Sequence, residues 1–474
     1  GRQIHREEMS DDEWVRITTL GCCREVGRAA FILSTPETRI LIDCGDKPGA
    51  EGEVPYLQVP EALGAGAATL DAVILTHAHL DHSALVPLLF KYGYDGPIYT
   101  TEPTRDLMGL LTLDYLDVAA KEGRTPPYES AQVRDAIKHT IPLEYGDVTD
   151  VAPDVKLTFH NAGHILGSAV THFHIGDGLY NVAFSGDIHY EDTRLFNGAV
   201  NDFPRVETLV LESTYGGRND YQTDQEDSEE ALKEVINETY EQGGKVVIPA
   251  FAVGRSQEIM LVLEEAMREG EIPEMPVHLD GMIWEATAIH TTYPEYLRDD
   301  LRDRIFHEDE NPFLADQFNH IDAGEDERQE VADGDECIVI STSGMIEGGP
   351  IMSWLRHIGP DPDSNLVFVG YQAQGTLGRR IQNGWDEIPV DGWGGGSRGD
   401  TLTLEMGVEV VDGFSGHADR QGLENFVKTM NPRPEKVLCV HGDESSVQDL
   451  SSSLYHDYNM RTFAPKNLET FRFK

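Results

Sequence analysis

The chain has 474 residues, 84 of them acidic and 37 basic, which gives a formal net charge of -47 beside a hydrophobic fraction of 39%. It is too long for one ordinary domain and too apolar for a disordered chain. No apolar run is long enough to cross a bilayer, and the acidic stretch Glu7 to Glu13 is unlike a signal peptide. These features predict a folded cytoplasmic protein of two or three units with no membrane partner.

The acidic excess itself points to the environment of the protein. Acidic, lysine-poor surfaces keep a protein hydrated in high salt, where charge repulsion is screened over about 3 Å at 1 M. We therefore expect a halophile, and an ordinary mesophilic protein with an acidic partner-binding face is the alternative. The five cysteines show neither CxxC spacing nor regular intervals, so we expect reduced, mostly buried thiols.

The first half of the chain alternates strand and helix patterns. Strands are predicted at Val15 to Leu20, Ala29 to Leu33, Arg39 to Asp43, Ala72 to Thr76 and Ile98 to Thr100, with helices at Ser83 to Tyr92 and Thr104 to Glu122. A strand block from Val155 to Phe184 follows, with a hairpin turn at Gly176 to Gly178. This alternation predicts the α/β class.

After Glu212 the pattern changes to a second lobe. It predicts an acidic linker at Gly216 to Glu230, helices at Glu229 to Tyr240 and Ser256 to Arg268, acidic loops such as Ile321 to Glu336, and strands at Lys245 to Pro249, Cys337 to Ser341 and Asn365 to Gly370. The Gly-rich stretch Asp391 to Asp400 is typical of a hairpin excursion, and Thr401 to Val411 alternates as a strand.

A cluster of metal-capable side chains lies directly behind the strand that ends near Thr76. His77, His79, Asp81 and His82 fall within six positions, and imidazole nitrogen with carboxylate oxygen suits Zn²⁺. The spacing turns His77 and His79 to one side of the loop while Asp81 and His82 face another. The cluster predicts a metal site with room for two ions.

Isolated histidines and acids further along the chain share a common local setting. Each follows an apolar strand-like run in a turn, usually one that contains glycine, which is where an α/β scaffold presents chemistry. They are Asp43, His164, Asp187, Glu212, His417 and His441. Any one of them alone is more often structural, but six in order behind the cluster predict a composite site.

At this point the sequence resembles a known family. The cluster with Asp43, His164 and Asp187 resembles the metallo-β-lactamase fold, and Glu212, His417 and His441 match three further motifs of the β-CASP nucleases. The runs at residues 24–28, 75–82, 101–105, 212–216, 251–255 and 370–380 are similar to the archaeal homologues of the cleavage and polyadenylation specificity factor endonuclease. The resemblance implies an αββα sandwich over residues 1–216 and 403–474, with an inserted α/β β-CASP domain over residues 217–402.

The resemblance also implies the roles of the site residues. One Zn²⁺ would be held by His77, His79 and His164, the second by Asp81, His82 and His441, and Asp187 would bridge them. The resemblance implies a catalytic role for Asp81 as well. His417 would donate a proton to the departing oxygen, Glu212 would orient it and keep it protonated, and Asp43 would support the ligands without binding metal.

Phosphate contacts need cations despite the acidic total. Arg255 at an expected helix start, Ser343 in a Gly-rich turn, and Arg379 with Arg380 are candidates for contacts to an RNA backbone. Packing between the lobes is the alternative for the Gly-rich segments. Because non-specific phosphate contacts weaken with salt, we expect this chain to bind RNA weakly.

The function that follows is a zinc-dependent endoribonuclease acting on single-stranded RNA, in 3′-end processing or termination of archaeal transcripts. A 5′ to 3′ exoribonuclease and a mainly RNA-binding subunit remain alternatives. The expected partners are RNA, RNA polymerase or its elongation factors, and a second copy bound through the C-terminal region, where Ala464 to Lys474 suits an edge strand. The family usually carries N-terminal KH domains and none precedes Val15, so we expect a core segment or a short paralogue.

Overall fold

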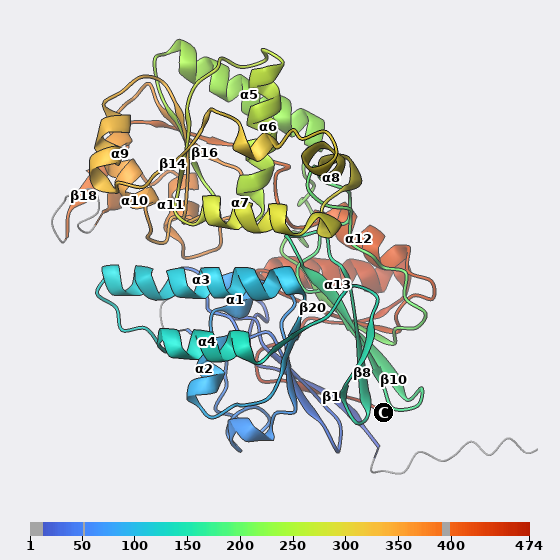
Figure 1. Cartoon of the computed structure of the whole chain (residues 1–474). Helices are drawn as coiled ribbons and strands as arrows, with labels where there is room; N and C mark the ends of the chain where they lie inside the picture. The colour runs from blue at the N-terminus through green and yellow to red at the C-terminus, as the bar shows by residue number, and fades with distance from the viewer. Residues whose placement is uncertain (1–12, 51–52, 391–398) are drawn as a thin grey trace, which may run out of the picture.

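The computed structural model describes residues 13–50, 53–390 and 399–474. In these ranges two seven-stranded sheets and one six-stranded sheet account for most of the strands. Figure 1 shows the first two sheets in the lower lobe and the third in the upper lobe. The predicted hairpin excursion at Asp391 to Asp400 lies largely outside the described residues.

The lower lobe is a sandwich of the two larger sheets. The first runs in the order β22 (Thr470–Phe473), β1 (Val15–Thr19), β2 (Phe31–Ser34), β3 (Arg39–Ile42), β4 (Ala72–Ile74), β5 (Ile98–Thr100) and β6 (Thr140–Pro142). The second runs β21 (Arg461–Phe463), β20 (Lys436–Val440), β11 (Thr208–Glu212), β10 (Tyr180–Phe184), β9 (Ala169–Ile175), β8 (Val155–Asn161) and β7 (Val148–Ala152). Their inner faces share one apolar core, in which the rings of Phe31 and Phe184 lie 5.5 Å apart.

Helices cover both outer faces of the sandwich. α2 (Val86–Lys91), α3 (Glu102–Lys121) and α4 (Ser130–Lys138) pack on the first sheet, and α12 (Arg420–Lys428) and α13 (Glu444–Tyr458) pack on the second (Figure 1). Each helix buries an apolar stripe against the outer side chains of a sheet that is already apolar on its inner face. The predicted αββα sandwich is confirmed.

The upper lobe is an α/β insert around the third sheet. Its strands run β14 (Phe318–His320), β13 (Val277–Asp280), β15 (Ile338–Ser341), β12 (Val246–Pro249), β16 (Asn365–Phe368) and β19 (Gly407–Val410), all parallel. One face is covered by α5 (Gln225–Glu241), α6 (Arg255–Arg268), α7 (Ile283–Thr292) and α8 (Asp299–Phe306). The other carries α9 (Glu325–Ala332), α10 (Ile351–Ile358) and α11 (Leu377–Gln382). Because β19 belongs to this sheet, the insert continues beyond residue 402.

Three predicted segments differ from the structure. The acidic loop predicted at Ile321 to Glu336 contains helix α9. This helix has no fully buried side chain, so its sequence shows no apolar period. Acidic residues in its first turn stabilise the helix through the helix dipole. The acidic linker is shorter than predicted, because Asp224 caps α5 by accepting from the amide of Asp227. The helix at Ser83 to Tyr92 is interrupted between α1 (Leu80–Ser83) and α2.

The predicted strand at Thr401 to Val411 is also wrong as one element. Its first part, β18 (Thr401–Thr403), pairs with β17 (Glu387–Pro389) in a separate two-stranded sheet, and β19 belongs to the third sheet. Between them the amides of Glu405 and Met406 donate to the Gly359 carbonyl at 2.9 and 3.0 Å, which turns the chain. The alternation of apolar and polar residues looks the same whether one long strand or two shorter strands carry it, so the sequence does not reveal the break.

Two other expectations, an edge strand near residue 470 and buried cysteines, are met. β22 lies at the edge of the first sheet, where it pairs antiparallel with β1, as predicted for Ala464 to Lys474; the dimer through this region stays a prediction. All five cysteines are buried and unpaired. No helix in the described ranges is both long enough and apolar enough to span a membrane.

Candidate metal centre

The predicted site residues lie at one edge of the sandwich, where strands of both sheets end. His77 and His79 follow β4, and Asp81 and His82 belong to the short helix α1. His164 is in the loop between β8 and β9, and Asp187 follows β10. Parallel strands bring their carboxyl ends to the same edge, so turns that are distant in sequence meet there.

The last ligand candidate arrives through a strand pair formed across the insert. β11 and β20 are neighbours in parallel register, with Glu212 opposite Val440. The residue after Val440 is His441, so this register sets His441 beside the end of β11. The insert leaves the sandwich after β11 and returns before α12, which places Glu212 and His417 on its two connections.

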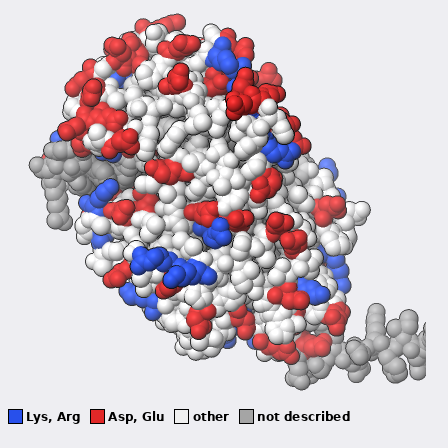
Figure 2. Space-filling model, viewed as in Figure 1, with Lys and Arg blue, Asp and Glu red and all other residues white. Residues whose placement is uncertain are grey.

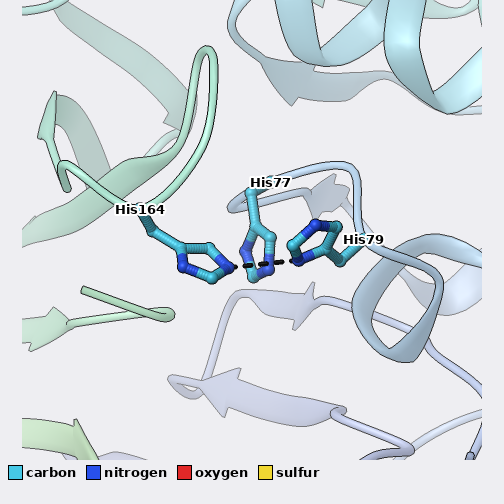
Figure 3. Close-up of side chains that lie close together, drawn as sticks. All are labelled: His77, His79 and His164. Carbon is cyan, nitrogen blue, oxygen red and sulfur yellow. Dashed lines mark hydrogen bonds between the residues drawn. The ribbon is translucent and has the colours of Figure 1, made fainter. Parts of the chain in front are cut away.

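Two main groups of side chains are close enough to hold metal ions, and a third, His164, Asp187 and His417, overlaps both. His77, His79 and His164 form the first, and Asp81, His82, Asp187 and His441 form the second; within each group the ligand atoms lie within 4.8 Å of one another. Figure 3 shows the three imidazoles of the first group converging from two loops, with His164 Nε2 3.1 Å from His79 Nδ1. His77 and His79 thus belong to one group and Asp81 and His82 to the other, as the spacing of the cluster predicts.

Asp187 lies between the two groups. Its Oδ2 is 3.3 Å from His77 Nε2 and 3.2 Å from His82 Nε2, and its Oδ1 is 3.4 Å from His441 Nδ1. Burial opposes a charge on Asp187, but His441 and His82 hold the pKa of its carboxyl well below the usual range. This carboxylate can therefore reach ions on both sides.

Hydrogen bonds behind the first group fix which nitrogen of each imidazole faces inward. His79 Nε2 donates to the Val253 carbonyl at 3.1 Å, and His164 Nδ1 donates to the Gly416 carbonyl at 2.7 Å. His77 Nδ1 lies 3.0 Å from Thr76 Oγ1, whose own proton goes to Asp43. The inward nitrogens are consequently the unprotonated ones, which is the state that a metal needs.

Those lone pairs are available to a cation. Burial lowers the pKa of His79 to about 4 and that of His164 well below its usual range, so neither carries an extra proton at neutral pH. Among the described residues, no hydrogen-bond partner satisfies the buried atoms His77 Nε2, His82 Nε2 and Asp187 Oδ1. Buried unpaired polar atoms are costly, and a divalent ion in each group would satisfy them. The donor set, imidazole and carboxylate, fits Zn²⁺.

Asp43 stands behind the second group. Its Oδ2 accepts from His82 Nδ1 at 2.7 Å and from Thr76 Oγ1 at 2.8 Å, while its Oδ1 accepts from the Thr76 amide at 2.8 Å. Asp43 thus accepts three hydrogen bonds inside the protein, and it leaves Nε2 of His82 free to face Asp187. Carboxylates that orient ligating histidines in this way raise their basicity.

His417 and Glu212 form a buried pair beside the metal groups. His417 Nδ1 lies 2.6 Å from Glu212 Oε2, and the His417 ring lies 4.8 Å from the His164 ring between centroids. Burial lowers the pKa of His417 and raises that of Glu212, so the two groups share one proton across a short hydrogen bond. The direction at His417 is opposite to the one expected from charge pairing alone, because desolvation outweighs the nearby carboxylates of Asp187 and Asp81.

Comparison with known proteins gives the family. Family models match the metallo-β-lactamase superfamily over residues 24–241, the Beta-Casp domain over residues 256–381, and a Zn-dependent metallo-hydrolase RNA specificity domain over residues 401–465. A protein named transcription termination factor FttA from Methanosarcina mazei is 59% identical over 473 residues, which span 100% of this chain and 74% of the relative. The chain belongs to the metallo-β-lactamase/β-CASP family.

Other relatives agree with this assignment. Proteins with the same name from Methanothermobacter thermautotrophicus and a Lokiarchaeum species are 51% and 44% identical, each over 100% of this chain and 74% of the relative. A crystal structure of a protein of unknown function from Enterococcus faecalis V583 has a TM-score of 0.55 over 97% of this chain and 100% of that one. At 12% identity this likeness shows the fold alone.

Three residues that sequence reasoning missed complete the surroundings of this β-CASP site. Thr76 links Asp43 to His77, Thr214 Oγ1 lies 3.1 Å from His441 Nδ1, and Gly416 supplies the carbonyl that holds His164. Thr76 directly precedes His77 and Thr214 lies two residues after Glu212, so a search for hydroxyl neighbours could have found them. The role of Gly416 is carried by its backbone and leaves no side-chain signal.

The predicted phosphate contacts lie in different settings. Arg255 is buried; it pairs with Glu258 and donates to the His164 carbonyl at 3.0 Å, so its guanidinium is engaged inside the protein. Ser343 donates to the Gly348 carbonyl at 2.9 Å within its own turn. Arg379 donates to the Gln372 carbonyl at 2.8 Å, and exposed Arg380 lies 5.0 Å from the Trp385 ring. RNA contacts by these four residues stay a prediction.

Proposed function

We propose that this chain is a zinc-dependent endoribonuclease that hydrolyses phosphodiester bonds of single-stranded RNA during termination of archaeal transcripts. The observation that carries the proposal is the His417 and Glu212 pair, set beside two groups of metal-capable side chains. A bare metal cluster of this kind suits several hydrolytic reactions, whereas a proton donor beside it suits a departing alkoxide. The matched RNA specificity domain and the names of the archaeal relatives support RNA as the substrate.

Each group of residues has a distinct task in this reaction. His77, His79 and His164 would hold one Zn²⁺, Asp81, His82 and His441 the other, and Asp187 would contact both. Bound zinc would supply Lewis acidity for the attacking water and for the phosphate charge. His417 donates the proton on Nε2 to the leaving oxygen, and the proton on the hydrogen bond to Glu212 then moves onto Nδ1. Glu212 also orients the imidazole through Nδ1 so that Nε2 faces the substrate.

The pair is suited to proton delivery because burial lowers the pKa of His417 and raises that of Glu212. Burial weakens the proton affinity of His417, and burial also makes an isolated charge on Glu212 unfavourable. The imidazole can release the proton on Nε2 and take the shared proton onto Nδ1, so the 2.6 Å contact to Glu212 is kept. General acids placed like this contribute roughly 100- to 10,000-fold to rate.

A circular RNA provides the deciding experiment, because only an internal cut can open it. Zinc-loaded protein is expected to linearise an unstructured circle, and His417→Ala with normal zinc content is expected to lose that activity. An exoribonuclease would degrade the linear form from its 5′ end and leave the circle intact. An RNA-binding subunit would retain both RNAs and cut neither, and that outcome would end the proposal.

The termination role needs its own test. A stalled archaeal elongation complex with a long nascent transcript is incubated with the wild-type chain or with Glu212→Gln. Cleavage of the emerging RNA followed by release of the polymerase from DNA is expected for the wild type only. Release by both proteins would show that cutting is not required for termination.

A further inference from the structure

Phe251 occupies an unusual place beside the first metal group. Its side chain is 37% exposed, whereas Ala250, Ala252 and Val253 on either side are 3%, 8% and 1% exposed. Its ring centroid lies 5.4 Å from that of His79, at an interplanar angle of 39°. Among the exposed large hydrophobic side chains of the described ranges, no other has a ring packed against a candidate ligand.

The loop that carries Phe251 is held rigidly between β12 and α6. The Phe251 carbonyl accepts from Ser256 Oγ at 2.8 Å, and the Ala252 carbonyl accepts from Gln257 Nε2 at 2.9 Å. The next carbonyl, that of Val253, accepts from His79 itself. The ring therefore keeps a fixed position relative to the metal group, although it belongs to the inserted lobe.

Gly344 supports the ring on another side. A Cβ added at Gly344 would lie 2.9 Å from the Phe251 amide nitrogen and 3.0 Å from the ring carbon Cδ2. The ring thus rests against bare backbone, with no side chain between them. Fixed by Gly344 and His79, it presents its remaining surface to solvent beside the site.

Charge makes such a surface valuable for binding RNA. The chain carries a formal net charge of -47, and Figure 2 shows acidic side chains over both lobes, with basic ones in small groups. Basic side chains that could contact phosphates are correspondingly few, and Arg255, which reaches the His164 carbonyl, is buried in an ion pair. Base stacking on an aromatic ring is insensitive to this charge and tolerates any base.

We propose that Phe251 is a stacking platform for one unpaired nucleobase next to the scissile phosphate, and that it biases the cleavage position towards a purine. A phosphate held at the His77, His79 and His164 group leaves the neighbouring base within one nucleotide of the ring, because His79 contacts that ring. Purines present a larger face than pyrimidines, so they stack more strongly. This inference rests on the proposed ribonuclease function and names the part of the substrate that the site reads.

The test combines a protein variant with a missing base. RNAs carrying one abasic ribose at successive positions around the mapped cut are given to the wild type and to Phe251→Ala. One abasic position is expected to lower kcat/KM of the wild type roughly 5- to 150-fold, Phe251→Ala to cause a similar loss on intact RNA, and the two losses not to add. The platform is refuted if Phe251→Ala cleaves intact RNA with the kcat/KM of the wild type. It is also refuted if every abasic position lowers kcat/KM of Phe251→Ala as much as that of the wild type.

Two further variants guard against trivial explanations. Tyr240→Ala removes an aromatic side chain that is 38% exposed on α5, in the outer layer of the insert, and is expected to leave every rate unchanged. Gly344→Ala keeps the ring but forces it to move. This variant is expected to reduce the loss of kcat/KM that the same abasic position causes. Loss of sensitivity in Tyr240→Ala as well would show a general effect and overturn the assignment.

A binding measurement separates this inference from the proposed function. RNA with 2-aminopurine at the sensitive position is bound to His417→Ala, and stacking is expected to quench the probe; adding Phe251→Ala is expected to restore its fluorescence. Quenching that depends on Phe251, in a chain whose wild type leaves all RNA uncut, would refute the nuclease and keep the platform. Quenching that survives Phe251→Ala would refute the platform and leave the nuclease standing.

Discussion

Arg255→Met tests how the inserted lobe is coupled to the metal centre. Arg255 begins α6, its side chain is 8% exposed, and it forms an ion pair with Glu258, whose side chain is 2% exposed. The same guanidinium donates to the backbone carbonyl of His164 in the other lobe. Methionine keeps much of the volume of arginine but removes the charge and both contacts.

The expected cost is large because the substitution leaves a buried charge without its partner. Removing one member of a buried ion pair destabilises a protein by about 3 to 5 kcal/mol, whereas replacing both members with apolar groups is often neutral. Burial already raises the pKa of Glu258, and Arg255 opposes that rise. A folded protein loses stability as pH increases through the raised pKa of a buried acid, because the acid must then ionise inside the protein. The cost of Arg255→Met should therefore shrink towards pH 5.

The assay is urea unfolding at pH 8 and pH 5, with zinc content measured on each folded sample. Arg255→Met is expected to lose about 3 to 5 kcal/mol at pH 8, and the double variant Arg255→Met with Glu258→Met to recover most of it. The control is Arg268→Met on the same helix, which breaks a pair whose arginine is 48% exposed and should cost about 0 to 1 kcal/mol.

The alternative is that Arg255 binds an RNA phosphate, as its sequence context predicts. Arg255→Met would then keep its stability, weaken RNA binding, and lower the salt dependence of that binding by about one counterion. Unchanged stability in the single variant, or a double variant no better than the single, would refute the coupling described above.

Three further outcomes are expected. Asp187→Asn should lower zinc content at both groups, because Asp187 faces both, and metal analysis showing two ions per chain would contradict its bridging position. Glu212→Gln should slow RNA cleavage roughly 100- to 10,000-fold at normal zinc content, and an unchanged rate would exclude the shared proton. Burial and the nearby Asp117 raise the pKa of Asp114 to about 6, so stability is lost as pH rises from about 4 through 6; Asp114→Asn should raise Tm at pH 8 but not at pH 4, unlike the exposed control Asp95→Asn.

Much of the sandwich could be predicted from local pattern. Strands such as β1 and β3 of the sandwich, and β12 of the insert, are short apolar runs between turn residues, and that signal is present in the sequence whatever the tertiary context. Helix α9 and the break between β18 and β19 could not be predicted in this way. α9 buries no side chain, and the break depends on the Gly359 carbonyl, more than forty residues earlier in the chain.

By itself, the sequence determined the chemistry available to this protein. The spacing of His77, His79, Asp81 and His82 is a local property, and so is the apolar run before each isolated histidine or acid. Tertiary structure alone decided how these groups act on one another, because proximity and burial depend on strands paired across hundreds of residues. The register of β11 and β20 sets His441 beside Glu212. Arg255 of the insert is buried between Glu258 and the His164 carbonyl, and Phe251 lies exposed between Gly344 and His79.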